Sequence, residues 1–273
     1  MTTTTVLPKV LRLTDPGLRE QLQALPASAA LIGVGTDGTA IAVDVDNAPH
    51  ILICTGAGGG STTILRTLTA QFLHQGAHAL VLDTPRISHL WATELPTVTH
   101  RGNVAGIHDA LVGLATELQR RTDLADHHDE RLDDVPRLMV VFDRADDTLR
   151  HLARYWETFR QEGEPKKSPA ITALEDVLYE GRQARIHVLY NGRASGGGLT
   201  ASAREQFATV ILARVGTHTW QRLAPIAGPA PKNSAHPGRV HVVRDGTAHQ
   251  TQALILTDIE AADWLTATAA GEI

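Results

Sequence analysis

The sequence is poor in cysteine, in aromatic residues and in long apolar runs. Cys54 is the only cysteine among the 273 residues, so no internal disulfide can form, which favours a reducing cytoplasm. No stretch reaches the ~18 consecutive apolar residues that a membrane-spanning helix requires, so we expect no membrane span. Because Phe, Trp and Tyr together make up 4% of the chain, we expect a core built mainly from Leu, Val, Ile and Ala.

The sequence also has no excess of positive charge. Its formal net charge is -5 with the 14 histidines taken as neutral, which excludes a globally basic nucleic-acid-binding protein. Contact with DNA would therefore have to come from a local basic surface. The hydrophobic content of 42% excludes a disordered chain and predicts a substantial core.

Apolar runs of strand length alternate with amphipathic segments of helix length along most of the chain. This order predicts an α/β fold with a mostly parallel central sheet flanked by helices, over residues 31–273, preceded by an N-terminal extension over residues 1–30. The dipeptides Asp37-Gly38 and Asp245-Gly246 predict a β-hairpin near either end of the domain. The expected buried strands are "HILIC", "AHALVLD", "RLMVVFD" and "RIHVLYN", and the expected helices include "STTILRTLTAQFLHQG" and "NVAGIHDALVGLATELQRRTDLA".

A glycine-rich segment separates the first of these strands from the helix that follows it. A phosphate-binding loop needs glycines, because its backbone amides turn inward at positive φ, and it needs a helix whose N-terminus carries partial positive charge. The segment meets both conditions, although a plain glycine-rich turn is the alternative interpretation. The predicted nucleotide-binding residues are Thr55, Gly56, Gly58, Gly59, Gly60, Ser61 and Thr62, together with Asp143 at the end of "RLMVVFD".

The loop lacks the lysine that loops of the type G-x-x-x-x-G-K-[ST] carry. Counted from Thr55, Gly60 takes the second glycine position, Ser61 the lysine position, and Thr62 becomes the magnesium-ligating hydroxyl. If one residue is deleted after Gly60, Ser61 becomes that hydroxyl, and the lysine is absent in either alignment. Losing one such preorganised charge costs about 3 to 4 kcal/mol of transition-state stabilisation, so ATP hydrolysis should be very slow.

A second departure follows the strand "RLMVVFD". Asp143 stands where phosphate-loop enzymes keep the carboxylate that holds magnesium, although an aspartate at this point is also a common helix N-cap. The next residue in such enzymes is often a glutamate that orients the attacking water, but here it is Arg144, which cannot act as that general base. We therefore expect ATP and Mg to bind weakly or not at all, with Thr62 and Asp143 as Mg ligands only if nucleotide binds.

The order and spacing of these segments resemble the FtsK/SpoIIIE family of DNA-translocating ATPases, in particular its short actinobacterial members, with degenerate Walker motifs. The resemblance implies a RecA-like P-loop NTPase fold, ATP with Mg as cofactor, double-stranded DNA as partner, and a homo-hexamer or a mixed ring with an active FtsK-like subunit. Ser61 then matches the family's lysine position, Arg144 its catalytic glutamate, and Arg193 the region of its polar sensor. The segments that carry the resemblance are "IGVGTDGTAIAVDVDNAPHILICTGAGGGSTT", "HALVLDTPRISHLWA", "PRLMVVFDRADD" and "RQARIHVLYNGRASGGGL".

Three basic residues are candidates for contact with DNA. Lys166 and Lys167 lie in the connection "PKKSP" between two expected helices, and Arg193 adjoins the glycine-rich segment "ASGGGL". Exposed cations of this kind contact the DNA backbone by charge neutralisation without reading its sequence. Ordinary solvated charges at helix ends are the alternative interpretation.

Three functions stay open at this point. The first is an FtsK-like protein that has lost most or all ATP hydrolysis and acts as a DNA-associated or assembly component in DNA transfer or maintenance. The second is an active ATP-dependent DNA translocase in which Lys166, Lys167, Arg66 or Arg86 replaces the missing lysine. The third is a structural protein that binds neither nucleotide nor DNA.

Overall fold

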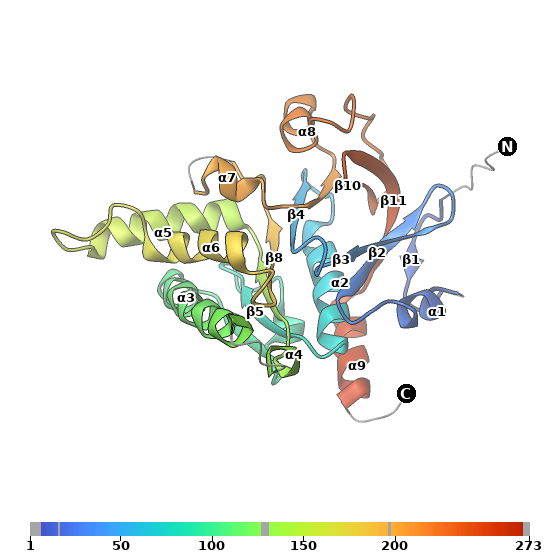
Figure 1. Cartoon of the computed structure of the whole chain (residues 1–273). Helices are drawn as coiled ribbons and strands as arrows, with labels where there is room; N and C mark the ends of the chain where they lie inside the picture. Colours follow the sequence, from blue (N-terminus) through green and yellow to red (C-terminus); the bar gives the residue numbers. More distant parts are fainter. Residues whose placement is uncertain (1–6, 16, 127–130, 196–197, 270–273) are drawn as a thin grey trace.

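The computed structural model describes residues 7–15, 17–126, 131–195 and 198–269. Within these ranges eleven strands form a single sheet in the order β3-β2-β11-β10-β9-β4-β8-β7-β5-β6, and β1 pairs with β11 (Figure 1). The strands are β1 (Leu11–Arg12), β2 (Ala29–Gly35), β3 (Ala40–Asp44), β4 (His50–Thr55), β5 (His78–Leu82), β6 (Val98–Arg101), β7 (Leu138–Phe142), β8 (Ile186–Asn191), β9 (Thr209–Ala213), β10 (Arg239–Arg244) and β11 (Thr247–Ile255).

The sheet has a parallel half and an antiparallel half. All neighbouring strands from β9 to β6 pair in parallel, and β10, β11, β2 and β3 extend the sheet by antiparallel pairing. The hairpin turns predicted at Asp37-Gly38 and Asp245-Gly246 are confirmed, since they join β2 to β3 and β10 to β11. The predicted α/β fold with its mostly parallel central sheet is therefore confirmed.

Helices cover both faces of the parallel half (Figure 1). One face packs against α3, α5 and α6, and the other face packs against α2 and α9. Alternate residues of β4 divide between these two cores: Leu52 and Cys54 belong to the first, and Ile51 and Ile53 to the second. The helices are α1 (Leu18–Gln23), α2 (Ser61–His74), η1 (Leu90–Ala92), α3 (Val104–Asp126), α4 (Arg131–Asp134), α5 (Ala145–Phe159), α6 (Pro169–Glu180), α7 (Ala201–Arg204), α8 (Thr217–Leu223) and α9 (Asp258–Ala269).

Burial on both faces explains why the central strands are continuously apolar, because helices on both sides leave no polar face for a strand to present. The strands β4, β7 and β8 are almost entirely buried. Since these strands run parallel, their carboxyl ends meet at one edge of the sheet. That edge brings together the loop after β4, Asp143 after β7 and the residues after β8.

The segment before β2 packs on the same sheet. β1 pairs in parallel with β11, and Leu11 and Leu18 share a small apolar cluster with Leu31 and Leu254. No helix in the described ranges is long and apolar enough to span a lipid bilayer.

Candidate functional site

The glycine-rich segment forms the loop between β4 and α2. Gly60 immediately precedes the first residue of α2 and has φ 85°, a torsion that side chains with a Cβ rarely adopt. At Gly56 the requirement is space, because a Cβ there would lie 2.2 Å from the backbone oxygen of Arg214. Both ends of the loop therefore require glycine, Gly60 for its backbone torsion and Gly56 because there is no space for a Cβ.

The backbone amides at the start of α2 are available to an anion. The amide of Gly56 donates to the carbonyl of Ala213 (2.8 Å), and that of Gly59 donates to Gly56 (2.9 Å). Within the described part of the chain, the amides of Gly60, Ser61 and Thr62 have no acceptor. A helix N-terminus with unpaired amides attracts negative charge through its dipole and its free donors.

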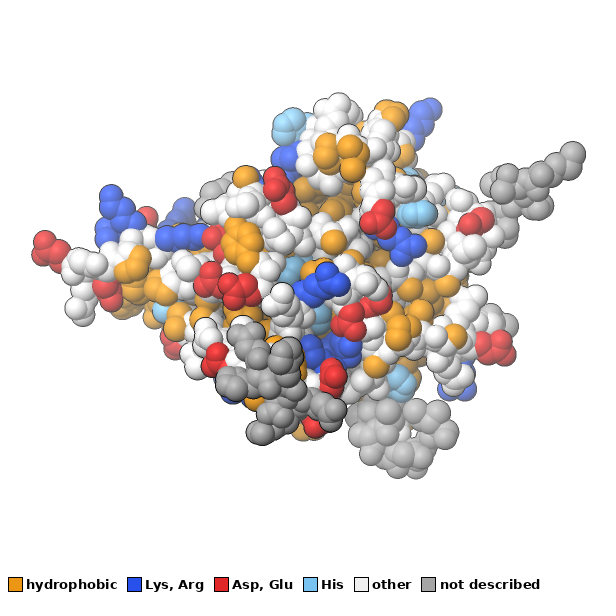
Figure 2. Space-filling model, in the orientation of Figure 1, with side chains coloured by type: hydrophobic (Ala, Val, Ile, Leu, Met, Phe, Trp, Pro, Cys, Tyr) orange, Lys and Arg blue, Asp and Glu red, His pale blue; other side chains and the backbone are white. Residues whose placement is uncertain are grey.

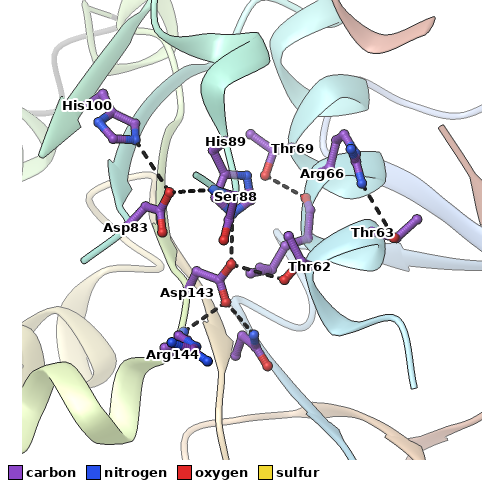
Figure 3. Close-up of polar contacts among 12 residues, drawn as sticks. Thr62, Thr63, Arg66, Thr69, Asp83, Ser88, His89, His100, Asp143 and Arg144 are labelled. Atoms are coloured by element: carbon purple, nitrogen blue, oxygen red, sulfur yellow. Dashed lines mark hydrogen bonds and ion pairs between the residues drawn. The ribbon is translucent and has the colours of Figure 1, made fainter. Parts of the chain in front are cut away.

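Thr62 and Asp143, predicted to act together, are brought into contact. The Thr62 hydroxyl donates to Oδ2 of Asp143 over 3.2 Å, although the two residues belong to α2 and to the end of β7 (Figure 3). This contact places the glycine loop and the end of the β7 strand on either side of one site. The hydroxyl that contacts Asp143 is thus that of Thr62.

Asp143 is buried and accepts three further hydrogen bonds. Its Oδ2 also accepts from Nε2 of His89 (3.2 Å), and its Oδ1 accepts from Nδ2 of Asn191 (2.5 Å) and from the amide of Arg144 (2.8 Å). Figure 3 shows His89, Thr62 and Arg144 around the carboxylate. His89 is itself fully buried, and its other ring nitrogen has no partner among the described residues. Because the carboxylate can only accept, Nε2 of His89 must carry the hydrogen.

These hydrogen bonds keep Asp143 ionised. Burial by itself would raise the pKa of the Asp143 carboxyl group, but the hydrogen bonds from His89, Asn191 and Thr62 outweigh it, and the pKa lies below its usual value. A carboxylate offers about four lone pairs, and the four donors from the protein use them. A Mg ion held here through water would need one of these lone pairs, so the residues present do not fit the usual water-mediated role of this carboxylate.

A polar cleft of about 690 Å³ opens beside Asp143, at the carboxyl ends of β4, β7 and β8. Of the predicted site residues, Thr55, Ser61, Thr62, Asp143 and Arg193 all line it. The cleft therefore contains residues that flank the glycine loop, together with residues from the ends of β7 and β8. Its remaining lining residues are Cys54, Ser88, Arg144, Asp146, Asp147, Arg150, Asn191, Gly192 and Ser195.

The position expected for a catalytic glutamate carries an exposed arginine. Arg144 adopts φ 49° at the start of α5, and its backbone amide binds Asp143. Two other carboxylates of the cleft, Asp146 and Asp147, are already engaged. Asp146 accepts from the Tyr190 hydroxyl (2.8 Å) and from the amide of Arg193 (2.6 Å), and Asp147 is paired with Arg150. Both carboxylates therefore already have partners within the protein.

Sequence reasoning missed several residues of the site. His89 and Asn191 hold Asp143, and Asp146 holds the segment after β8, yet none of them belongs to a motif with fixed spacing. Arg214 was also missed. It directly follows β9, and its Nη1 lies 3.0 Å from the point that a Cβ on Gly58 would occupy. A polar residue at the end of each buried strand was the available signal, but the sequence does not show that β9 lies next to β4.

Three of the four cations proposed as substitutes for the missing lysine are engaged elsewhere. Arg66 is paired with Asp258, at the start of α9, and Nε of Arg86 donates to the carbonyl of Gly102 (2.9 Å). Lys167 is paired with Glu175 of α6. None of these three side chains lines the cleft beside Asp143.

The three candidates for DNA contact lie in two separate places. Lys166 and Lys167 are exposed in the connection between α5 and α6, whereas Arg193 lines the cleft. Figure 2 shows basic and acidic side chains interspersed on the face that it presents, with several of the basic ones over α5. A single continuous basic surface is not formed on that face.

The chain shares its fold with solved ATPase structures. No protein-family model and no curated protein matches it. Similar structures are the conjugation coupling protein TcpA of pCW3 as a monomer with ATPγS (TM-score 0.76, 18% identity, 97% of this chain and 76% of that chain) and EssC, ATPases 2 and 3, from Geobacillus thermodenitrificans (TM-score 0.75, 16% identity, 98% and 52%). A third is the cytoplasmic domain of the type VII secretion ATPase EccC from Thermomonospora curvata (TM-score 0.67, 16% identity, 92% and 28%).

These identities are low, so the similarity concerns the fold. The chain spans about half of the EssC structure and less than a third of the EccC structure, and it spans most of the TcpA structure. The mixed sheet flanked by helices, with the glycine loop at the carboxyl edge of its parallel half, is the RecA-like P-loop fold of these ATPases. The fold expected from the resemblance to the FtsK/SpoIIIE family is confirmed.

Proposed function

We propose that this chain is an FtsK/SpoIIIE-like P-loop protein that binds a nucleotide but has lost most or all of its ability to hydrolyse it. One observation carries the proposal. The Thr62 hydroxyl and the Asp143 carboxylate keep the contact expected of a nucleotide site, while Ser61 and Arg144 stand where a phosphate-binding lysine and a catalytic glutamate are needed. The scaffold of the site is retained and the groups that act in the transition state are replaced.

Nucleotide binding is supported by the loop and by the cleft. The free amides of Gly60, Ser61 and Thr62 are donors for a phosphate, and the cleft beside them is large enough for a ligand of several hundred Å³. The TcpA structure, which shares the fold, is described as a complex with ATPγS. The proposed ligand of this chain is accordingly ATP.

Loss of hydrolysis follows from the chemistry of the two replaced positions. Without the lysine, charge that develops on the transferred phosphoryl group is less stabilised, at a cost of about 3 to 4 kcal/mol for a single preorganised donor. Without the glutamate, no group orients and deprotonates the attacking water, and a general base is typically worth about 10² to 10⁴ in rate. The neighbouring carboxylates Asp146 and Asp147 already have other partners, the Tyr190 hydroxyl and the Arg150 guanidinium.

The proposed biological role is suggested by the proteins that share the fold. The similar structures include a conjugation coupling protein and secretion ATPases. We propose that this chain is a DNA-associated or assembly component in DNA transfer or maintenance, working in the cytoplasm as a homo-hexamer or in a mixed ring with an active FtsK-like subunit. Lys166 and Lys167 on the α5–α6 connection are the proposed contacts with double-stranded DNA, whereas Arg193 lines the cleft proposed for the nucleotide.

A turnover assay with radiolabelled ATP tests the loss of hydrolysis. We expect a rate far below about 1 per second, the lower end of typical enzymes, with and without double-stranded DNA. A rate at or above that value would establish an active translocase instead. A gel-shift series at rising salt tests the DNA contact, because binding dominated by phosphates must weaken steeply. Absence of both nucleotide and DNA binding would leave the purely structural alternative.

A further inference from the structure

We infer that the cleft holds the triphosphate of a nucleotide through arginine side chains and loop amides, without a magnesium ion. The inference rests on the proposed nucleotide binding and specifies how the charge of the phosphates is neutralised. In phosphate-loop proteins a lysine and Mg share this task. Here Arg144 and Arg193, which line the cleft, and Arg214, which lies over Gly58 of the adjoining glycine loop, provide the positive charge.

The carboxylate of Asp143 is already occupied by hydrogen-bond donors of the protein. Both oxygens of this carboxylate already accept two hydrogen bonds each, from His89 and Thr62 on one side and from Asn191 and the Arg144 amide on the other. A water molecule in the shell of a Mg ion must donate to such a carboxylate to be held by it. It would have to displace one of these donors, and a fully buried donor such as the His89 ring cannot turn to solvent in exchange.

The glycine loop has a cation beside it, the side chain of Arg214. Nη1 of Arg214 lies over Gly58, close enough that a Cβ on that glycine would be 3.0 Å away. The guanidinium makes only one hydrogen bond within the described residues, from Nη2 to the carbonyl of Ala235 at 3.4 Å. An arginine has five N–H donors in a planar fork that suits phosphate oxygens, so most of them are available to a ligand on the loop. Arg214, directly after β9, thus provides the positive charge that a lysine at the start of α2 would otherwise carry.

Two further arginine side chains, Arg144 and Arg193, line the cleft itself. The guanidinium groups of Arg144 and Arg193 have no acidic partner among the described residues, whereas Arg150 is paired with Asp147. The backbone of Arg193 is fixed on both sides: its amide donates to Asp146 (2.6 Å), and its carbonyl accepts from Nη2 of Arg222 (2.7 Å). Rigid placement of the backbone lowers the entropy lost when the side chain binds a phosphate.

Calorimetric titration with ATP tests this inference, carried out once in excess magnesium chloride and once in excess EDTA. We expect the two dissociation constants of the wild-type chain to agree within about threefold. The Arg214→Gln variant should bind about tenfold or more weakly in both buffers, since a charge-assisted hydrogen bond is worth at least that factor. Arg160→Gln, which removes an exposed arginine at the end of α5, is the matched control and should leave both constants unchanged.

Tightening of ATP binding by tenfold or more in magnesium would overturn the inference while leaving a non-hydrolysing nucleotide site intact. Unchanged affinity in Arg214→Gln would overturn the role of that arginine. No binding in either buffer would overturn both the inference and the proposed nucleotide binding. Thermal unfolding of each variant checks that it is folded, and if Arg214→Gln is not, Arg193→Gln replaces it with the same expected loss.

Discussion

The hydroxyl of Thr62 lies 3.2 Å from the carboxylate of Asp143, which joins the first turn of α2 to the end of β7. In the sheet β8 lies between β4 and β7, so this contact reaches across the end of β8. The residue before Thr62 is a serine and the residue after Asp143 is an arginine. The contact expected of a nucleotide site is therefore kept, whereas the two neighbouring positions expected to act in hydrolysis carry other residues.

Restoring the lysine should improve binding more than turnover. We expect Ser61→Lys to tighten ATP binding by about tenfold, because a charge-assisted hydrogen bond to phosphate contributes at least 1.4 kcal/mol, or about a factor of ten. Turnover should stay far below about 1 per second, since Arg144 still takes the position of the general base. Calorimetry and an ATPase assay on the same sample measure both effects. Ser61→Ala is the control, and turnover of several per second in Ser61→Lys would contradict the account.

The two ends of the glycine loop should respond differently to an added methyl group. Gly60→Ala meets no nearby atom and should cost about 1 to 2 kcal/mol, the penalty of a left-handed torsion for a residue with a Cβ. Gly56→Ala should cost clearly more, because its Cβ would lie 2.2 Å from the Arg214 backbone and would push β9 from β4. Urea denaturation measures both free energies of unfolding. Equal losses in the two variants would show that the loop is not packed against Arg214.

The hydrogen bond from Tyr190 to Asp146 should support the segment after β8. We expect Tyr190→Phe to lower the free energy of unfolding by about 1.5 to 3 kcal/mol, because it removes a buried donor to a charged acceptor. Tyr179→Phe is the matched control. Its hydroxyl contacts Thr200 and Ser202 at the surface, so its loss should stay below about 1 kcal/mol. A Tyr190→Phe variant as stable as the control would contradict the anchoring role of Asp146.

Two buried histidines should make the protein less stable in mild acid. Burial lowers the pKa of His50 to about 3, and it lowers the pKa of His187 to about 4. The unfolded chain binds a proton at each site near pH 6.5 while the folded chain stays neutral, so stability falls as the pH drops below that value. Between pH 7 and pH 5 we expect a loss of about 2 kcal/mol for each histidine.

Urea denaturation at several pH values measures this loss. His187→Asn keeps a donor near the carbonyl of Pro49 but cannot titrate, so its stability should fall less steeply with pH than that of the wild type. His78→Asn, at an exposed position, should leave the slope unchanged. If the His187→Asn slope equals that of the wild type, His187 is not neutral in the folded protein.

The sequence was sufficient to predict most strands of the parallel half of the sheet. Short continuous apolar runs such as "HILIC" and "RLMVVFD" are typical of strands that are buried on both faces, and the glycine loop follows the first of them as predicted. Thr62 and Asp143 were predictable as a pair, because the carboxyl ends of parallel strands share one edge. The helix α9 and the strand β6 were not predicted, since neither the segment after β11 nor "VTHR" carries a strong periodic pattern.

The partners of Asp143 and of the glycine loop were beyond reach of the sequence. His89, Asn191 and Arg214 come to the site from three different connections, and only the strand order brings those connections together. The substitute cations considered from the sequence, such as Arg66 and Arg86, are near the loop in sequence or motif but are engaged with other groups in space. Proximity in the chain was a poor guide to the charge that reaches the loop.

The most direct test is the chemical state of the nucleotide that the protein holds. We would incubate the full chain with doubly labelled ATP for many minutes, isolate the complex by rapid gel filtration, and separate the bound nucleotides by chromatography. Because hydrolysis is proposed to be lost, we expect the bound nucleotide to be recovered as intact ATP. Recovery of ADP, with released phosphate in excess over protein, would contradict it and would identify the chain as a working ATPase.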